Sequence, residues 1–252
     1  MLIIIIIIIY SFTLGTKGIF IKEYKVETNK LRSAEESIKV LHFSDLFYGS
    51  TINKNDLNKI INKINNTRPD VVIFTGDLLK KDYKLTEEEK SFMTKKFKKI
   101  NAEIGKFYVT GENDFDSSND ILNMAEFINI EENIQKIFVS NNDYIYLLDK
   151  KADLSQIKED NNFKLLITHN PMDIKALSIK DYDMIIAGHT LNGSINIPKI
   201  KELFIDGKYT KTYQKINGTK LFINPGLGTN KVKARLFNHP TIYLYRIKKA
   251  SK

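Results

Sequence analysis

The stretch Ile38-Lys39-Val40-Leu41-His42-Phe43-Ser44-Asp45 is an apolar run that ends in a carboxylate. Four later segments repeat this pattern, each a β-rich run followed by a carboxylate or an imidazole: residues 71–77, 106–114, 164–169 and 184–189. Continuous apolar runs of this length are typical of strands buried on both faces. Ligands collect at the carboxyl ends of such strands. The sequence therefore predicts a metal site at one edge of a sheet.

The composition fits one large globular domain. The chain has 252 residues, of which 42% are hydrophobic and 27% charged. The net charge of +9 is compatible with an anionic partner, although a general bias toward lysine would also produce it. The lysines are scattered, and no array of aromatic and basic residues resembles a nucleic-acid surface. We therefore expect no nucleic-acid partner. The chain has no cysteine, which excludes thiolate metal ligands.

The first residues are strongly apolar. From residue 2 to 21 the only charged side chain is Lys17, and a membrane span needs about 20 residues. A signal peptide and a buried poly-isoleucine strand are the alternatives, but neither a positive n-region nor a cleavage site is visible. We expect a hydrophobic membrane anchor at residues 1–21 and a single domain at residues 22–252. Basic residues after the anchor favour a cytoplasmic body.

Helical spacing and capping patterns predict helices at residues 53–66, after Thr86-Glu87-Glu88-Glu89, and at 117–127. Further strands are predicted at residues 19–27, 136–140, 144–148, 202–205, 220–223 and 241–247, with a turn at Asn141-Asn142-Asp143. Alternating strands and helices that give way to strands alone indicate an α/β (α+β) fold. Its expected architecture is a two-layered mixed β-sheet sandwich flanked by helices.

Short motifs along residues 38–247 form a specific set. They are Ser44-Asp45-Leu46 with Tyr48-Gly49, Thr75-Gly76-Asp77-Leu78, His169-Asn170-Pro171, Ala187-Gly188-His189-Thr190, Asn192-Gly193-Ser194 with Pro198, Gly226-Leu227-Gly228-Thr229 and Arg235-Leu236-Phe237. In this order the set resembles the calcineurin-like metallophosphoesterases, and more narrowly their small, membrane-anchored bacterial branch.

The resemblance implies two metals at the sheet edge, bridged by Asp77. One of them would be held by Asp45, Asp77 and two histidines. This chain has neither histidine, because Phe47 and Leu191 stand at those positions. We therefore expect this metal to be lost, with Asp45 at most supporting a weak second ion through water.

The other implied metal position keeps its ligand types. The resemblance assigns it Asp77, His169, His189 and an asparagine, and Glu112 stands in place of that asparagine. Two carboxylates and two imidazoles suit Mn, Fe or Zn. We therefore expect one firmly held divalent ion at these four side chains.

The resemblance also places a phosphate-contacting histidine at position 113, where this chain has Asn113, with Asp114 expected to orient it. Asparagine donates a hydrogen bond but gives up no proton, and a general acid contributes about 10²–10⁴-fold. We expect a metal-dependent phosphoesterase that hydrolyses a mono- or diester near the membrane, acting on a phosphorylated small molecule or a lipid headgroup. The alternative is a degenerate family member that binds a phosphorylated ligand or partner without turnover.

Overall fold

The computed structural model describes residues 1–32, 37–140, 143–157, 161–191, 193–197, 199, 209, 211–230 and 232–250. The predicted turn residues Asn141 and Asn142, the predicted strand at residues 202–205, and the motif residues Asn192 and Pro198 lie outside this described part of the chain.

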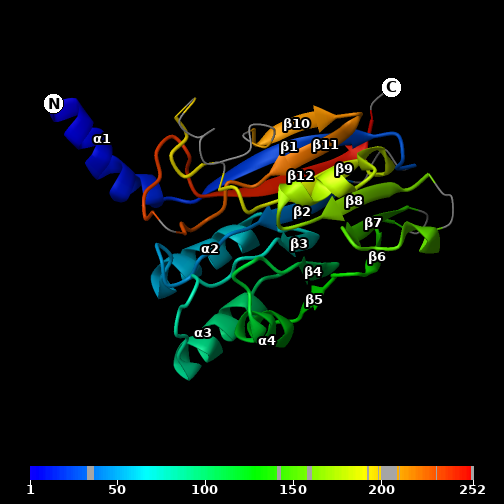
Figure 1. Ribbon diagram of the computed structural model, residues 1–252. Helices are drawn as coiled ribbons and strands as arrows, with labels where there is room; N and C mark the ends of the chain where they lie inside the picture. Colours follow the sequence, from blue (N-terminus) through cyan, green and yellow to red (C-terminus); the bar gives the residue numbers. More distant parts are fainter. Residues whose placement is uncertain are drawn as a thin grey trace.

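Two six-stranded mixed sheets form the body (Figure 1). The first has the order β1 (Phe20–Thr28), β12 (Thr241–Lys249), β2 (Ser37–Phe43), β3 (Val71–Phe74), β4 (Gly105–Tyr108) and β5 (Phe127–Asn129). The second has the order β10 (Tyr213–Ile216), β11 (Thr219–Ile223), β9 (Met184–Ala187), β8 (Phe163–Ile167), β7 (Tyr144–Asp149) and β6 (Ile134–Phe138). The expected two-layered mixed β-sheet architecture is confirmed.

The side chains of β2 show why the run around Asp45 is apolar without interruption. Successive residues of a strand point to opposite faces of its sheet. Ile38 and Val40 pack in the core between the two sheets. Leu41 and Phe43 pack on the other face, in the core beneath the helices. Both faces of β2 are therefore buried, as the sequence predicts.

Three helices cover the outer face of the first sheet: α2 (Lys54–Asn66), α3 (Glu87–Lys98) and α4 (Asp116–Met124). Asn53 and Thr86 close capping boxes at the starts of α2 and α3. The predicted third helix is too long at its end. Glu126 adopts a left-handed backbone with φ of 67°, which stops the helix, and Phe127 begins β5.

The N-terminal segment differs from the prediction. Helix α1 (Leu2–Phe12) ends after 11 residues, and a 3₁₀ turn (Leu14–Thr16) follows it. Phe20 and Ile21 already belong to β1, where they pair with Thr241 and Ile242 of β12. The prediction of one membrane-length segment over residues 1–21 is therefore wrong. Within the described part of the chain, no helix combines the length and the apolar character that crossing a bilayer requires.

Candidate metal centre

The loops that follow five strands meet at one end of the two sheets. Strands β2, β3 and β4 run parallel in the first sheet, as do β8 and β9 in the second. Asp45, Asp77, residues 111–114, His169 and His189 follow these strands in that order. Because parallel strands end at the same edge, the fold gathers these loops, as the sequence predicts.

A buried group of three side chains lies at the centre. Asp45, Asp77 and His169 each offer a ligand atom, and these atoms lie within 4.8 Å of one another. The Nε2 atom of His169 is 3.5 Å from Oδ2 of Asp77. Oδ1 of Asp45 is buried and accepts no hydrogen bond from the described residues. A buried carboxylate oxygen is costly unless a donor or a cation satisfies it, so the group fits a metal ion.

His189 extends this group. Its Nδ1 atom is 3.2 Å from Nε2 of His169, and its backbone N–H donates a hydrogen bond of 3.0 Å to Oδ2 of Asp45. Imidazole nitrogens bind zinc at about 2.0–2.1 Å, so two of them on one ion are separated by roughly 3 Å. The spacing of the two histidines therefore suits a shared ion.

Glu112 lies at the rim of the site. Its Oε1 atom is 3.8 Å from Nδ1 of His189, and its side chain is 65% exposed. The same oxygen accepts a long hydrogen bond of 3.5 Å from the side chain of Asn170. The structure thus brings three of the four predicted ligands close together and places Asp45 among them. Glu112 is adjacent to His189 but outside the buried group.

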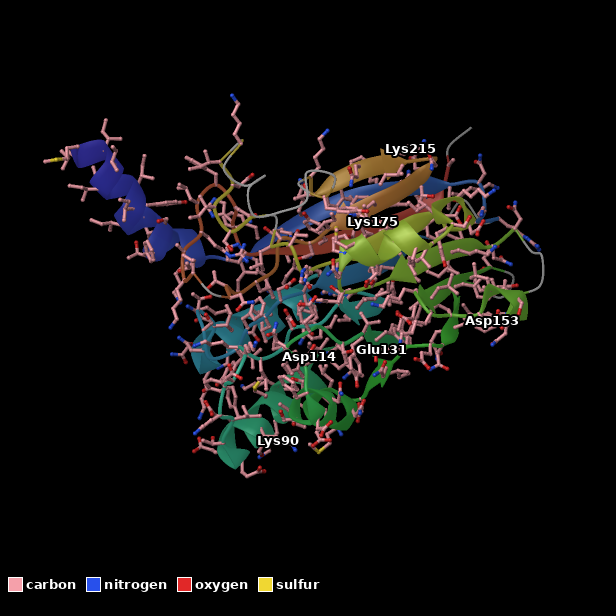
Figure 2. All side chains as sticks on the ribbon, viewed as in Figure 1. Lys90, Asp114, Glu131, Asp153, Lys175 and Lys215 are labelled. Carbon is pink, nitrogen blue, oxygen red and sulfur yellow. The ribbon has the colours of Figure 1, made fainter. Side chains whose placement is uncertain are left out.

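Asn113 and Asp114 both act on Asp77. The backbone N–H and the side-chain amide of Asn113 each donate a 2.9 Å hydrogen bond to the Asp77 carboxylate. Asp114, labelled in Figure 2, accepts hydrogen bonds from the backbone N–H groups of Asp77, Leu78 and Gly111 at 2.7 to 2.9 Å. The sequence assigns Asp114 to orienting Asn113. In the structure Asp114 holds the turn that carries Asp77.

Apolar side chains occupy the two positions where the resemblance implies histidines. Phe47 is 1% exposed. The side chain of Leu191 and Cβ of Asp45 both pack against Gly226, within 2.6 and 2.8 Å of where a Cβ atom on that glycine would lie. This side of Asp45 therefore offers no imidazole ligand among the described residues.

Several residues of the site have a strained backbone. The left-handed non-glycine residues there are Asp45 at φ 51°, Phe47 at 46°, Asp77 at 62°, His189 at 66° and Leu191 at 51°. This conformation costs roughly 1–2 kcal/mol per residue relative to the right-handed one. It persists where the surrounding structure enforces it, and it is typical of functional sites.

The charges of the group influence one another. Burial raises the pKa of Asp45 to about 7, and the nearby Asp77 carboxylate adds to this rise. Burial alone lowers the pKa of His169, but the carboxylates of Asp45 and Asp77 outweigh it, so the pKa is raised. Burial and the neighbouring His169 lower the pKa of His189. Negative charge is therefore concentrated where a cation would neutralise it.

The sequence argument missed two supporting groups. The carbonyl oxygen of Thr75 lies 2.6 Å from Nδ1 of His169. Arg235 is fully buried and donates hydrogen bonds to the carbonyl oxygens of Pro225 and Gly228. The N–H of Gly228 in turn donates a 2.8 Å hydrogen bond to the Asp45 carbonyl oxygen. Arg235 belongs to a motif noted in the sequence, but that motif gives no sign of this positioning role.

The sequence is similar to those of known proteins. Residues 38–193 match the calcineurin-like phosphoesterase family. A metallophosphoesterase of Campylobacter jejuni is 26% identical over 90% of this chain, which spans 63% of that relative's length. A metallophosphoesterase of Bacillus subtilis is 25% identical over 90% of this chain and 84% of its own length. A transmembrane protein with a metallophosphoesterase domain from Bos taurus is 21% identical over 84% of this chain and 53% of its own length. The chain therefore belongs to the calcineurin-like phosphoesterase family, whose members are phosphoric ester hydrolases that normally use divalent metals.

Proposed function

We propose that the protein hydrolyses a phosphate mono- or diester with a single divalent ion, Mn, Fe or Zn, held by Asp45, Asp77, His169 and His189. The observation that carries this proposal is the buried approach of Asp45, Asp77 and His169, whose ligand atoms lie within 4.8 Å of one another. Carboxylate oxygens and imidazole nitrogens together suit these metals. Glu112 at the rim is placed to bind through an intervening water.

A bound divalent ion lowers the pKa of water and acts as a Lewis acid toward a phosphate oxygen. The chain's own residues set the geometry. Asn113 fixes the Asp77 carboxylate through two hydrogen bonds. The amide of Asn113 can also donate to a phosphate oxygen, but it supplies no proton to a leaving group. We therefore propose that turnover is fastest for esters whose leaving group needs no general acid.

A cavity of about 360 Å³ opens beside the metal centre, and His169 and Glu112 line it. Pockets of this size hold small ligands. Lys150 and Lys151 also line it, and each is paired with a carboxylate. We propose that the cavity receives the organic part of the phosphoester, either a phosphorylated small molecule or a lipid headgroup near a membrane surface.

The test is hydrolysis of bis(p-nitrophenyl) phosphate with added Mn²⁺, with bound metal measured on the same samples. Asp77→Asn should lower kcat/KM by more than about 100-fold, because it removes a charged ligand at the centre. Asp82→Asn is the matched control. Asp82 is exposed and has nearly the same backbone conformation, with φ of 61° against 62° for Asp77.

Phe47 and Leu191 favour a second function, the binding of a phosphorylated ligand without turnover, because they stand where the family resemblance implies two histidine ligands. The same samples distinguish the two functions. Bound metal without Mn²⁺-dependent hydrolysis, together with phosphate binding in a calorimeter, would support the second. A protein that binds no divalent metal would contradict the first function.

A further inference from the structure

Helix α1 presents apolar side chains on every side. From Leu2 to Ile9 the side chains are between 37% (Ile7) and 72% (Ile3) exposed. Figure 2 shows them projecting from a helix that stands away from the body. A helix that is hydrophobic all round needs an apolar environment on all sides. A single groove on a partner protein would cover only one side of α1.

The base of α1 is seated on the body beside the metal centre. Ser11 and Thr16 are buried there. The backbone N–H of Arg235 donates a 2.8 Å hydrogen bond to the Ser11 carbonyl oxygen. The side chain of Arg235 holds Gly228, which bonds to the backbone of Asp45. The helix therefore leaves the body at a defined point, next to the loops that carry the site.

A basic cavity lies at the same base. It measures about 300 Å³, and Lys17, Lys59 and Lys63 line it with a single carboxylate, Asp56. Lys17 pairs with Asp56 at 3.2 Å, and Lys63 donates a hydrogen bond to the carbonyl oxygen of Ile19. Three cations face one anion, so the cavity carries net positive charge. Its chemistry suits a phosphate group.

We propose that α1 inserts into the acyl region of a lipid bilayer and that the cavity at its base receives the phosphate of an anionic lipid. The 11 residues of α1 extend about 16 Å, which is far enough to carry their side chains into the ~30 Å hydrocarbon core of a bilayer. Acyl chains surround an inserted helix on all sides. A second copy of the chain would cover one side only and would bring two basic cavities together. The proposal does not depend on the phosphoesterase activity.

Flotation of the full chain with vesicles tests the proposal. One set of vesicles is phosphatidylcholine alone, and the other is an equimolar mixture of phosphatidylcholine and phosphatidylglycerol. We expect binding to both, and tighter binding to the anionic set. The double variant Ile3→Asp, Ile6→Asp should abolish binding to both sets. Both side chains are exposed, so circular dichroism should show an unchanged fold.

Lysine variants test the headgroup cavity. Lys59→Gln should lower partition into the anionic vesicles about fivefold, since one basic residue near an anionic surface contributes about 1 kcal/mol. Partition into phosphatidylcholine alone should stay the same. Lys95→Gln is the matched control, because Lys95 is an exposed lysine of α3, far from α1 in Figure 1. It should have no effect.

Three results would overturn the proposal. The first is no binding to either vesicle, and the second is binding that survives the Ile3→Asp, Ile6→Asp change. The third is self-association in analytical ultracentrifugation, without lipid, that the same double variant abolishes. Equal effects of Lys59→Gln and Lys95→Gln would overturn the assignment of the headgroup to the cavity.

Discussion

Thr75 and His169 are joined by a buried hydrogen bond, 2.6 Å long, between the Thr75 carbonyl oxygen and Nδ1 of His169. A carbonyl oxygen only accepts, so Nδ1 of His169 carries the proton. The lone pair of Nε2, which lies 3.5 Å from Oδ2 of Asp77, is then the one that would bind an ion shared with Asp77. The bond fixes the tautomer and the ring orientation that a metal ligand requires.

Replacing His169 should therefore weaken metal binding sharply. Losing an outer partner of a metal ligand costs about 10–100-fold in affinity, so we expect His169→Gln to lower Mn²⁺ affinity by at least about 100-fold. Equilibrium dialysis with metal analysis measures this. His239→Gln is the control, because the ring of His239 contacts Phe20 away from the centre. Equal affinity in the two variants would contradict the assignment of His169.

His42 should make stability depend on pH. It is fully buried between Tyr245 and Thr75, and burial lowers its pKa from 6.5 to about 3. Between these values the unfolded chain binds a proton that the folded chain does not. The stability that neutral His42 contributes is therefore present above pH 6.5 and is lost as the pH falls toward 3. At pH 5 this loss amounts to about 2 kcal/mol.

The variant His42→Gln isolates this effect, because glutamine keeps a hydrogen-bonding side chain but gains no proton. Asp45 titrates with the opposite sign. Its pKa is raised to about 7, so its contribution grows as the pH falls. Wild type and His42→Gln both contain Asp45. The difference between their free energies of unfolding in urea, measured at pH 7 and at pH 5, therefore does not include the Asp45 contribution. The stability advantage of wild type should shrink by about 2 kcal/mol, and a constant difference would contradict the role of His42.

Much of the fold is predictable because its signals are local. The apolar run of β2 and the capping boxes at Asn53 and Thr86 involve residues close together in sequence. The end of α1 is different, because it is held by a bond between Ser11 and Arg235, more than two hundred positions apart. Periodicity in residues 1–21 carries no trace of that contact, so the sequence predicts one long segment there.

The candidate site is likewise predictable from the sequence only in part. Strand-end position predicts that Asp45, Asp77 and His169 meet, since parallel strands end at one edge. It does not predict where a side chain within a loop points. Glu112 and Asp114 are two residues apart, yet the Glu112 side chain is 65% exposed, whereas Asp114 is bound to three backbone N–H groups. These orientations depend on the loop conformation.

Gly226 should be intolerant of substitution. Its φ of +73° is left-handed, and a Cβ atom there would lie 2.8 Å from Cβ of Asp45 and 2.6 Å from Leu191. Gly226→Ala should therefore cause both steric crowding and backbone strain. Gly218→Ala is the matched control, since Gly218 has φ of +95° and nothing within 4 Å of the added atom.

Both glycine variants should lose the roughly 1–2 kcal/mol that a left-handed alanine costs. Gly226→Ala should lose about 1–3 kcal/mol more, because overpacking forces neighbours to move. It should also weaken Mn²⁺ binding by displacing Asp45. Chemical denaturation and metal titration measure the two effects. Equal stability of the two variants would show that Asp45 is not packed against Gly226.

Restoring the histidines that the family resemblance implies should create a second metal position. In the double variant Phe47→His, Leu191→His, the new imidazoles stand at the two positions where the resemblance implies ligands, and both positions have a left-handed backbone, with φ of 46° and 51°. Histidine tolerates that conformation better than phenylalanine or leucine does. We expect bound Mn²⁺ to rise from one ion to two per chain, measured by metal analysis after gel filtration. The swap Phe47→Leu, Leu191→Phe disturbs the same packing without adding a ligand. This variant should still bind one Mn²⁺ ion per chain. A second ion in the swap, or none gained in the double histidine variant, would contradict the inference that apolar side chains at these positions limit the site to a single metal.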